Sequence, residues 1–344
     1  MKSILTSGKF ALTAVFAIFM IALTGSNFNN SSFKFTKALN SELSVASCVE
    51  KILSWVEFKV KGDNDMLLSR PELLVTKESL ERRAKVKNAD QLIDITDVPL
   101  NEPYVSEIIS TGIGVKQRSK WFNRISCYMT REQMLEAADK DFVKSLDIVR
   151  KFKVNYEFPE TPESPVFPEA GSGETDGIES MNYGSSLAQM QIINAVMTHD
   201  SGYYGQGVII AMFDAGVDNI EHNCFDSIRA RGYRSYDFVN NDTIVDDQSG
   251  QMGQGWHGTM CLSLIGGYRP GSIISPAFRS KFFIAKTENT DSETPLEEDN
   301  WVAAAEWADS LGADVISSSL GYIGMDAGST RSYDWTWMNG DSCI

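Results

Sequence analysis

The sequence predicts an α/β fold in which an incomplete parallel sheet with flanking helices follows a small α+β module. The first observation is the unbroken apolar run Val208–Phe213, which is typical of a strand buried on both faces of a parallel sheet and which ends at Asp214. The second is a strand–helix–strand spacing further on. Its parts are an apolar strand at Phe282–Lys286, a helix from Thr294 to about Ser310, and a strand at Asp314–Leu320.

Composition bounds the possible functions. The chain has 344 residues, of which 42% are hydrophobic and 22% charged, as expected of a globular protein. Its net charge of −15 argues against a nucleic-acid partner, which would require a basic surface. The five cysteines show neither close pairing nor metal-ligand spacing, so we expect most to be buried thiols whose disulfide pairing the sequence does not define.

The amino terminus has the pattern of a secretory signal, which we assign to residues 1–26. Lys2 and Lys9 precede the apolar stretch Phe10–Leu23, and small residues follow it. The stretch is short for a membrane span, so no transmembrane helix is expected once the signal is removed. The chain is therefore predicted to be secreted or held at the cell envelope. Residues 27–50, rich in Asn, Ser and Thr, are expected to form a poorly ordered leader.

Residues 51–154 predict a compact module with the order β-α-(α)-β-β-α-β, the split βαβ pattern of ferredoxin-like folds. Asn101 is the expected cap of one helix, and Thr130 with Gln133 has capping-box spacing at the start of another. The expected strands are Leu53–Val60, Gly114–Arg118, Asn123–Met129 and Phe142–Val149, and the helices are Thr76–Lys87, one from Asn101, and one from Thr130 to about Asp139.

Residues 155–181 read as a linker. It contains four prolines within ten residues, then a Gly-rich acidic stretch, and it shows no hydrophobic period. Such a segment is exposed and readily cut by proteases. The remaining region, 182–344, begins with a predicted helix at Ser185–His199 that carries apolar side chains on one face.

The stretch Gly255–Cys261, reading GWHGTMC, supplies a second chemically active residue. An apolar helix continues through Thr259–Ile265, which places His257 in its first turn, where the helix dipole favours a neutral imidazole able to accept a proton. The other two histidines, His199 and His222, lie in polar, loop-like sequence. We therefore expect Asp214 and His257 to form a catalytic pair at the edge of one sheet.

Taken together, DAG at a strand end and HGT at a helix start resemble the subtilisin-like serine peptidases. Ser318–Gly321 is similar to that family's substrate-lining strand, and the module before the linker resembles its inhibitory propeptide. Tyr183–Ser186 and Thr287–Ser310 are similar to a secreted bacterial branch of it. Residues 182–344 would then be the N-terminal part of the peptidase domain.

The resemblance implies roles for particular residues. Asp214 would orient His257, and His257 would act as general base and then general acid. Ser319, Leu320 and Gly321 would bind an extended peptide or protein substrate through main-chain hydrogen bonds. The protein's own propeptide would occupy the same groove. Calcium is possible by resemblance, although no site is identifiable, and no other cofactor or metal is implied.

The sequence also departs from the family. The Gly-Thr-Ser helix start that carries the nucleophile and the Asn that donates to the oxyanion are both missing, and neither Ser329 nor Ser342 has the expected surroundings. Loss of the serine costs about 10⁶ in rate in subtilisin, a published case, so this C-terminally truncated chain is expected to be an inactive fragment of a secreted endopeptidase. The alternative is a non-catalytic pseudo-protease that binds peptides in a retained groove.

Three other interpretations are weaker. The acidic residues between Glu288 and Asp299 could bind calcium, but a solvated helix start explains them better. Cys261 could be a nucleophile, but its place one turn after His257 predicts packing in an apolar row. A dinucleotide-binding enzyme is excluded because Asp214–Asp218 does not supply a GxGxxG turn.

Overall fold

The computed structural model describes residues 34–149 and 181–321, apart from residues 45, 48, 63, 252, 253 and 291–294. The predicted signal, the predicted linker up to residue 180, Ser329 and Ser342 therefore lie outside the described residues. The chain divides into two compact units. In its described part, the first contains residues 34–61, 100–116 and 123–149, and the second contains 62–99, 117–122 and the region from 181 onward.

The first unit has the predicted ferredoxin-like topology. Its four-stranded sheet has the order β2-β3-β1-β4, and β1 pairs antiparallel with both β3 and β4. Helix α5 connects β1 to β2 and α6 connects β3 to β4. The bounds are β1 Ile52–Phe58, α5 Glu102–Ser110, β2 Gly114–Ser119, β3 Arg124–Met129, α6 Arg131–Asp139 and β4 Val143–Ile148.

The expected helix caps of this unit are present. The Asn101 side chain accepts a hydrogen bond from the backbone N–H of Tyr104, and Thr130 with Gln133 forms a complete capping box. These contacts satisfy N–H groups that have no partner inside their own helix. Local sequence therefore predicted both helix starts correctly.

The expected leader contributes a helix to the first unit, which corrects the prediction for residues 27–50. Helix α2 spans Lys37–Leu43, and Thr36 caps it. Phe35, Leu39 and Leu43 are buried in the same core as β1 and β4. The helix has only seven residues, too few for a hydrophobic period to be visible in sequence.

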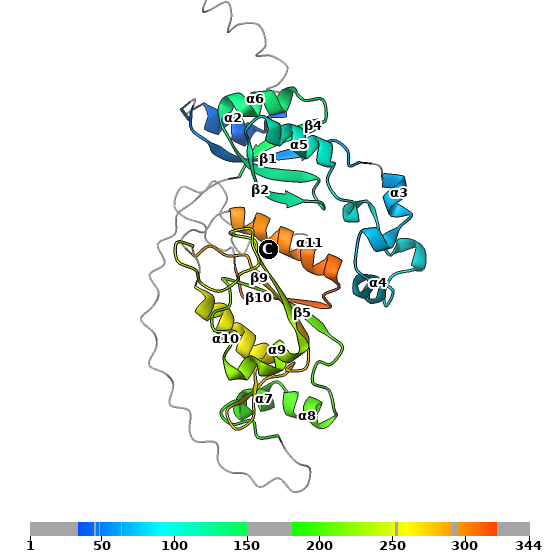
Figure 1. The fold of residues 1–344 in the computed structure, drawn as a ribbon, viewed down its shortest axis with the longest axis vertical. Helices are drawn as coiled ribbons and strands as arrows, with labels where there is room; N and C mark the ends of the chain where they lie inside the picture. Colours follow the sequence, from blue (N-terminus) through cyan, green and yellow to red (C-terminus); the bar gives the residue numbers. More distant parts are fainter. Residues whose placement is uncertain are drawn as a thin grey trace, which may run out of the picture. The chain divides into compact units, whose positions relative to one another are not determined.

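The second unit contains the parallel sheet predicted from the sequence, with strand order β10-β5-β9-β6. Ile210 and Met212 of β5 pack in a core with Leu262 of α10, whereas Ala211 and Phe213 pack on the opposite face with the alanines of α11. Figure 1 shows α10 and α11 on opposite sides of these strands. The bounds are β5 Ile209–Asp214, β6 Tyr233–Asp237, α10 Gly255–Gly266, β9 Lys281–Lys286, α11 Pro295–Leu311 and β10 Val315–Ser318.

The predicted helix at Ser185–His199 is two short helices. Asn194 between them adopts a left-handed backbone conformation with φ 57°, which interrupts the helix. Strand β6 and the helix before it were not predicted, because their polar residues show no clear period.

The remaining elements are α3 Asn64–Leu68, α4 Lys77–Arg83, α7 Leu187–Ile192, α8 Ala195–Asp200, α9 Asp226–Arg231, β7 Tyr268–Arg269 and β8 Ile273–Ile274, with 3-10 turns η2 Pro71–Leu73, η3 Ala89–Gln91, η4 Ile95–Asp97 and η5 Asn223–Phe225.

Segments 62–99 and 117–122 contact helix α11 within the second unit. Arg83 makes a bidentate pair with Asp97 (2.7 and 2.8 Å) and also pairs with Asp309 of α11. Glu306 accepts hydrogen bonds from the Ser119 hydroxyl (2.6 Å) and the Lys120 backbone N–H (2.8 Å). Burial raises the pKa of Glu306, although these hydrogen bonds oppose the shift. Charge-assisted contacts thus fix both segments to one helix.

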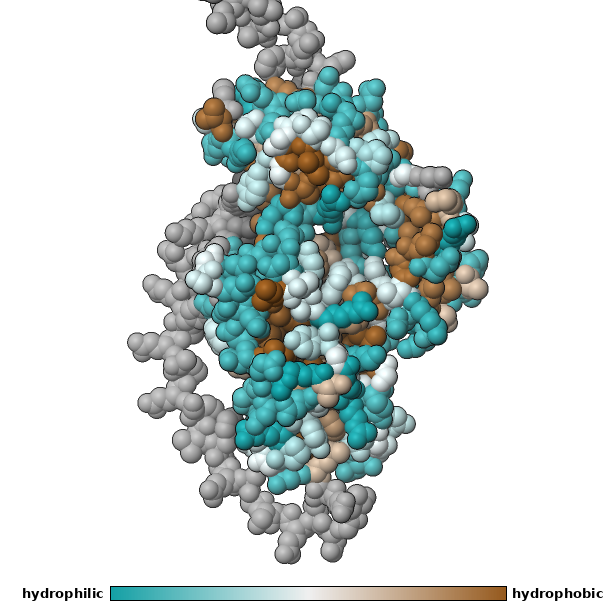
Figure 2. All heavy atoms as spheres, viewed as in Figure 1, coloured by the Kyte–Doolittle hydropathy of each residue, from teal (hydrophilic) through white to brown (hydrophobic). Residues whose placement is uncertain are grey.

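The surface is largely hydrophilic on the face that Figure 2 shows, with apolar side chains in separate patches. Met66 and Leu73, for example, are half exposed. Among the described residues, no helix is both long and apolar enough to cross a membrane.

Candidate active site

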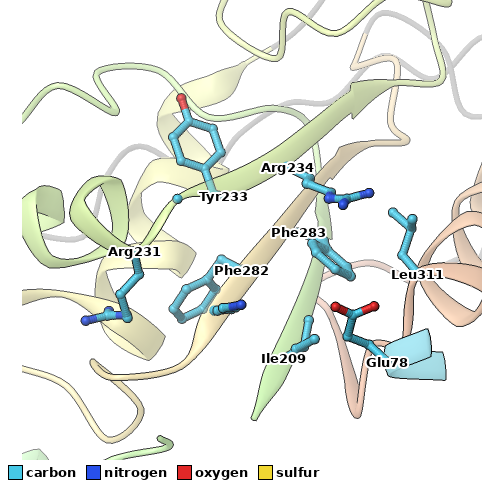
Figure 3. A pocket seen from close by; sticks show the side chains of 10 residues that line it. Glu78, Ile209, Arg231, Tyr233, Arg234, Phe282, Phe283 and Leu311 are labelled. Atoms are coloured by element: carbon cyan, nitrogen blue, oxygen red, sulfur yellow. The ribbon is translucent and has the colours of Figure 1, made fainter. Parts of the chain in front are cut away.

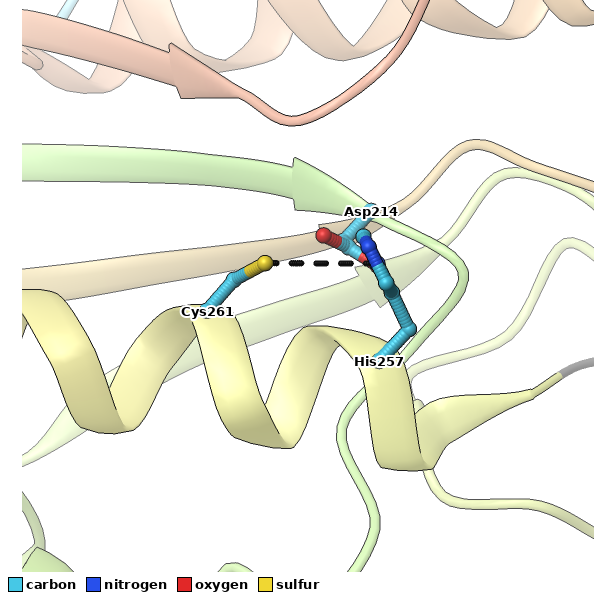
Figure 4. A group of neighbouring side chains, drawn as sticks. All are labelled: Asp214, His257 and Cys261. Carbon is cyan, nitrogen blue, oxygen red and sulfur yellow. Dashed lines mark hydrogen bonds and ion pairs between the residues drawn. The ribbon is translucent and has the colours of Figure 1, made fainter. Parts of the chain in front are cut away.

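Asp214 and His257 meet at the carboxyl edge of the parallel sheet, as the sequence predicts. Asp214 is the last residue of β5 and is fully buried, whereas His257 lies in the first turn of α10 with a side chain 35% exposed. Their Oδ1 and Nδ1 atoms are 2.7 Å apart (Figure 4). Oδ1 also accepts a hydrogen bond from the Ala215 backbone N–H (2.7 Å). The carboxylate is thus placed to orient a partly exposed imidazole.

Two glycines allow α10 to approach β5 this closely. A Cβ on Gly258 would lie 1.9 Å from the Gly216 carbonyl oxygen and 3.1 Å from the Asp214 side chain. Gly216 has φ +112°, and a Cβ there would lie 2.4 Å from the Val245 carbonyl oxygen. Only residues without a side chain fit such approaches, which explains the glycines of DAG and HGT.

Thr259 completes the HGT motif by tying the helix to the loop after β5. Its hydroxyl donates to the Asp218 carbonyl and lies 2.7 Å from the Gly255 carbonyl within its own helix. The Gly255 N–H in turn donates to the Asp247 carboxylate (3.0 Å). Burial raises the pKa of Asp246 and that of Asp247, and the neighbouring Asp218 raises both further. The hydrogen bond from the Gly255 N–H opposes the shift of the Asp247 pKa.

A buried row of charged residues crosses the same edge and was not singled out from the sequence. Asp214 of β5 and Asp237 of β6 both lie in register with Lys286 of β9, and all three are fully buried. Lys286 Nζ is 3.6 Å from Asp237 Oδ2. Lys286 could have been found from the sequence, because it follows the apolar run Phe282–Ala285 directly. The same pattern, an apolar run that ends in a charged residue, identified Asp214.

Cys261 faces the pair more closely than the sequence suggested. It lies one turn after His257, is partly buried against the apolar core, and has its Sγ 3.9 Å from His257 Nδ1. Burial raises the pKa of the Cys261 thiol, Asp214 raises it further, and hydrogen bonding to Ser319 opposes the shift. Asp214, His257 and Cys261 each offer a metal-binding atom, and these atoms lie within 4.8 Å of one another.

The predicted substrate-binding residues Ser319, Leu320 and Gly321 directly follow β10. Strand β10 is at the end of the sheet order, with β5 as its neighbour among the described strands. Ser319 and Gly321 are exposed. Because Ser319 interacts with Cys261, this segment lies close to the Asp214–His257 pair.

Two predictions about other residues were wrong. His199 is buried rather than in a polar loop, with ring nitrogens 2.8 Å from the Tyr183 hydroxyl and 3.0 Å from the Pro276 carbonyl. Glu297 and Asp299 at the start of α11 are also buried, so this acidic cluster is not a solvated helix start. Asp291 and Glu293 of the cluster lie outside the described residues.

A cavity of about 240 Å³ lies at the opposite edge of the sheet, where β5, β6 and β9 begin (Figure 3). Arg231, Arg234 and Lys281 contribute cationic side chains to its lining, and Glu78 contributes a carboxylate. Asp214 and His257 do not line it. It is therefore separate from the chemistry considered above.

Comparison with known families supports the assignment of both regions. Residues 53–164 match the Peptidase S8 propeptide domain of Bacteroidota, and residues 205–342 match the Subtilase family. The chain carries a subtilase-family peptidase domain. No curated protein matches the chain.

Solved structures similar to this chain include the following two. Fervidolysin from Fervidobacterium pennivorans, described as a keratinolytic enzyme related to subtilisin, is 14% identical with a TM-score of 0.45, covering 79% of this chain and 36% of its own. The epidermin leader peptide processing serine protease of Staphylococcus aureus, as a serine-to-alanine mutant, is 14% identical with a TM-score of 0.42, covering 78% and 50%. The subtilase chain thus spans a third to a half of the length of these proteins.

Proposed function

We propose that this chain belongs to a secreted subtilisin-like serine endopeptidase, in which Asp214 orients His257 and His257 is the general base of a Ser-His-Asp mechanism. The observation that carries the proposal is the 2.7 Å approach of Asp214 Oδ1 to His257 Nδ1 at the carboxyl edge of the sheet. In subtilases such a pair, arranged on an α/β sheet, activates a serine.

In this mechanism each residue of the pair has one task. Asp214 is fully buried and accepts a hydrogen bond from Nδ1–H, which leaves Nε2 free to accept a proton. His257 Nε2 takes the proton of a serine hydroxyl during attack on the scissile carbonyl, and returns it to the leaving amine. Ser319–Gly321, beside an unpaired strand edge in the described sheet, would pair with the backbone of an extended substrate.

Residues 1–344 do not contain the sequence pattern expected around the nucleophilic serine of this mechanism. None of their serines has a Gly-Thr-Ser helix start. We therefore expect this chain alone not to react with a fluorophosphonate probe, as measured by intact-mass spectrometry. Stoichiometric labelling at Ser319, Ser329 or Ser342 would contradict the assignment.

The orientation of His257 can be tested without catalysis. In ¹⁵N NMR spectra of the full chain, the His257 ring is expected to carry its proton on Nδ1, held there by Asp214. Asp214→Asn removes the acceptor, so we expect the Nε2-protonated form to become populated. Asp226→Asn, which alters an exposed carboxylate, is the control and should leave the tautomer unchanged. An unchanged tautomer in Asp214→Asn would remove the basis of the proposed mechanism.

A second candidate, a peptide-binding pseudo-protease, is favoured by the exposed segment after β10. It predicts that extended peptides bind the full chain and that charge or proline substitutions at Ser319 or Gly321 weaken binding.

The region upstream of the peptidase domain fits an inhibitory propeptide, and the amino terminus fits export from the cytoplasm to the cell envelope or the medium.

A further inference from the structure

Three side chains with different donor atoms converge beside the sheet edge. Asp214 ends β5, and His257 and Cys261 stand four residues apart on one face of α10. Figure 4 shows the carboxylate, the imidazole and the thiol facing one another. Nδ1 is 2.7 Å from Oδ1 and 3.9 Å from Sγ, and all three donors fall within 4.8 Å of one another.

The second carboxylate oxygen of Asp214 adds an independent observation. Asp214 is fully buried, and its Oδ2 has no hydrogen-bond partner among the described residues. A buried acceptor without a partner is costly and uncommon in folded proteins, so its presence calls for an explanation. The oxygen belongs to the same carboxylate that faces the imidazole and the thiol. A cation at this point would satisfy it.

We propose that Asp214, His257 and Cys261 form a Zn²⁺ site that inhibits the catalytic pair. Zinc favours a thiolate, an imidazole nitrogen and a carboxylate oxygen, at about 2.0 to 2.3 Å, in tetrahedral sites. A thiolate and an imidazole together disfavour calcium and magnesium, which take oxygen ligands. Three protein ligands leave one position for water.

The donors need only small movements to reach this geometry. With these bond lengths, neighbouring donors in a tetrahedral site are roughly 3.3 to 3.7 Å apart. The carboxylate and imidazole must therefore separate slightly from 2.7 Å, and the thiol must approach slightly from 3.9 Å.

Binding redistributes protons in a way that blocks catalysis. The thiol loses its proton to solvent as the Zn–S bond forms. Zinc takes the Nδ1 lone pair, so the neutral ring carries its single proton on Nε2, and the net release is one proton per zinc ion. Nε2 can then no longer accept a proton from a serine. Only this inhibitory consequence rests on the proposed function; metal binding itself does not.

The test is metal binding by the full chain after treatment with a chelator and a thiol reductant. Cobalt(II) serves as the spectroscopic probe, and zinc affinity is measured by competition with a chromogenic chelator. We expect one ion per chain and a thiolate-to-cobalt charge-transfer band, which zinc abolishes. Cys261→Ala is expected to remove the band and to weaken zinc binding by at least about tenfold, the smallest loss usual for metal-site residues.

Cys224→Ala is the matched control, because Cys224 is another free cysteine beside a histidine, His222 (3.1 Å). It should bind zinc like the unmodified chain. Circular dichroism verifies that each variant is folded, and Cys261→Ser provides a conservative replacement if Cys261→Ala is not. Absence of the band, equal zinc affinity in the folded Cys261 variant, or loss of binding in Cys224→Ala alone would overturn the site. None of these outcomes depends on peptidase activity, so the proposed function stands or falls separately.

Discussion

Asp214 and Asp237 occupy equivalent positions in the sheet, but their carboxylates differ in their hydrogen-bond partners. Each ends a parallel strand next to β9, and each is fully buried. Asp237 accepts hydrogen bonds from the backbone N–H groups of Val239 (2.8 Å) and Asn240 (2.9 Å) and from the Asn240 side chain, and it pairs with Lys286. Asp214 has one oxygen shared by His257 and Ala215, and its other oxygen has no hydrogen-bond partner in the part of the chain that the structure describes.

The difference separates a structural carboxylate from one available for chemistry. Each oxygen of Asp237 is held by neighbours in its own turn, so its charge stabilises the fold. Only one oxygen of Asp214 accepts hydrogen bonds from described residues, and its side-chain partner is the partly exposed imidazole of His257 on another element. Position at the carboxyl edge of a sheet therefore does not by itself distinguish these two carboxylates; their hydrogen-bond partners do.

The largest expected effect is on Asp237. Asp237→Ala would leave Lys286 as an unpaired buried charge and three donors without acceptors. We expect the free energy of unfolding to fall by about 3 to 5 kcal/mol. Urea denaturation followed by circular dichroism measures it. If Asp214→Ala cost as much as Asp237→Ala, the distinction between the two carboxylates would be lost.

An intermediate effect is expected for Gly258, which sets the distance between α10 and Asp214. In Gly258→Ala the new Cβ would meet the Gly216 carbonyl, so helix and loop must separate. We expect a loss of about 1 to 3 kcal/mol, typical of overpacking, together with a weaker Asp214–His257 hydrogen bond visible in the ¹⁵N spectrum of the ring. Gly321→Ala, whose Cβ would meet nothing within 4 Å, is the control. Equal stability of the two variants would show that the close approach is not required.

The smallest effect is a pH dependence at the same edge. Because the pKa of Asp247 is raised by burial and by Asp218, the folded state binds more protons than the unfolded state. Its contribution therefore favours the folded state at low pH and is lost as pH rises from about 4, the ordinary range of aspartate, through the raised pKa. Asp247→Asn keeps an acceptor for Gly255 and should flatten this decline. A steeper decline in the variant would contradict the sign.

Sequence reasoning predicted most of the fold because the relevant signals are local. The run at Val208–Phe213 is buried on both faces, and the caps at Asn101 and Thr130 start their helices as expected. Strand β6 was missed because Tyr233–Asp237 is largely polar, and its place beside β9 depends on pairing far along the chain. The break at Asn194 depends on one backbone angle, which apolar spacing does not encode.

The candidate site was predicted only where a motif names its members. Asp214 and His257 were found because DAG and HGT are distinctive in combination. Lys286 and Asp237 were missed because a row across three strands requires the sheet register, which a single sequence does not supply. Cys261 was assigned to an apolar row, since helical spacing alone does not show which side of the row faces the strand end.

Helix α2 has a practical consequence for work on the ferredoxin-like module. Leu39 and Leu43 pack in the core beside β4. A recombinant module that starts at residue 51 would lack both side chains and would therefore have a cavity in its core. Cavities of this kind cost about 2 to 5 kcal/mol for each leucine, which is comparable to the whole stability of a small domain. A recombinant module should therefore begin before Phe35, within the region that the sequence composition predicted to be a poorly ordered leader.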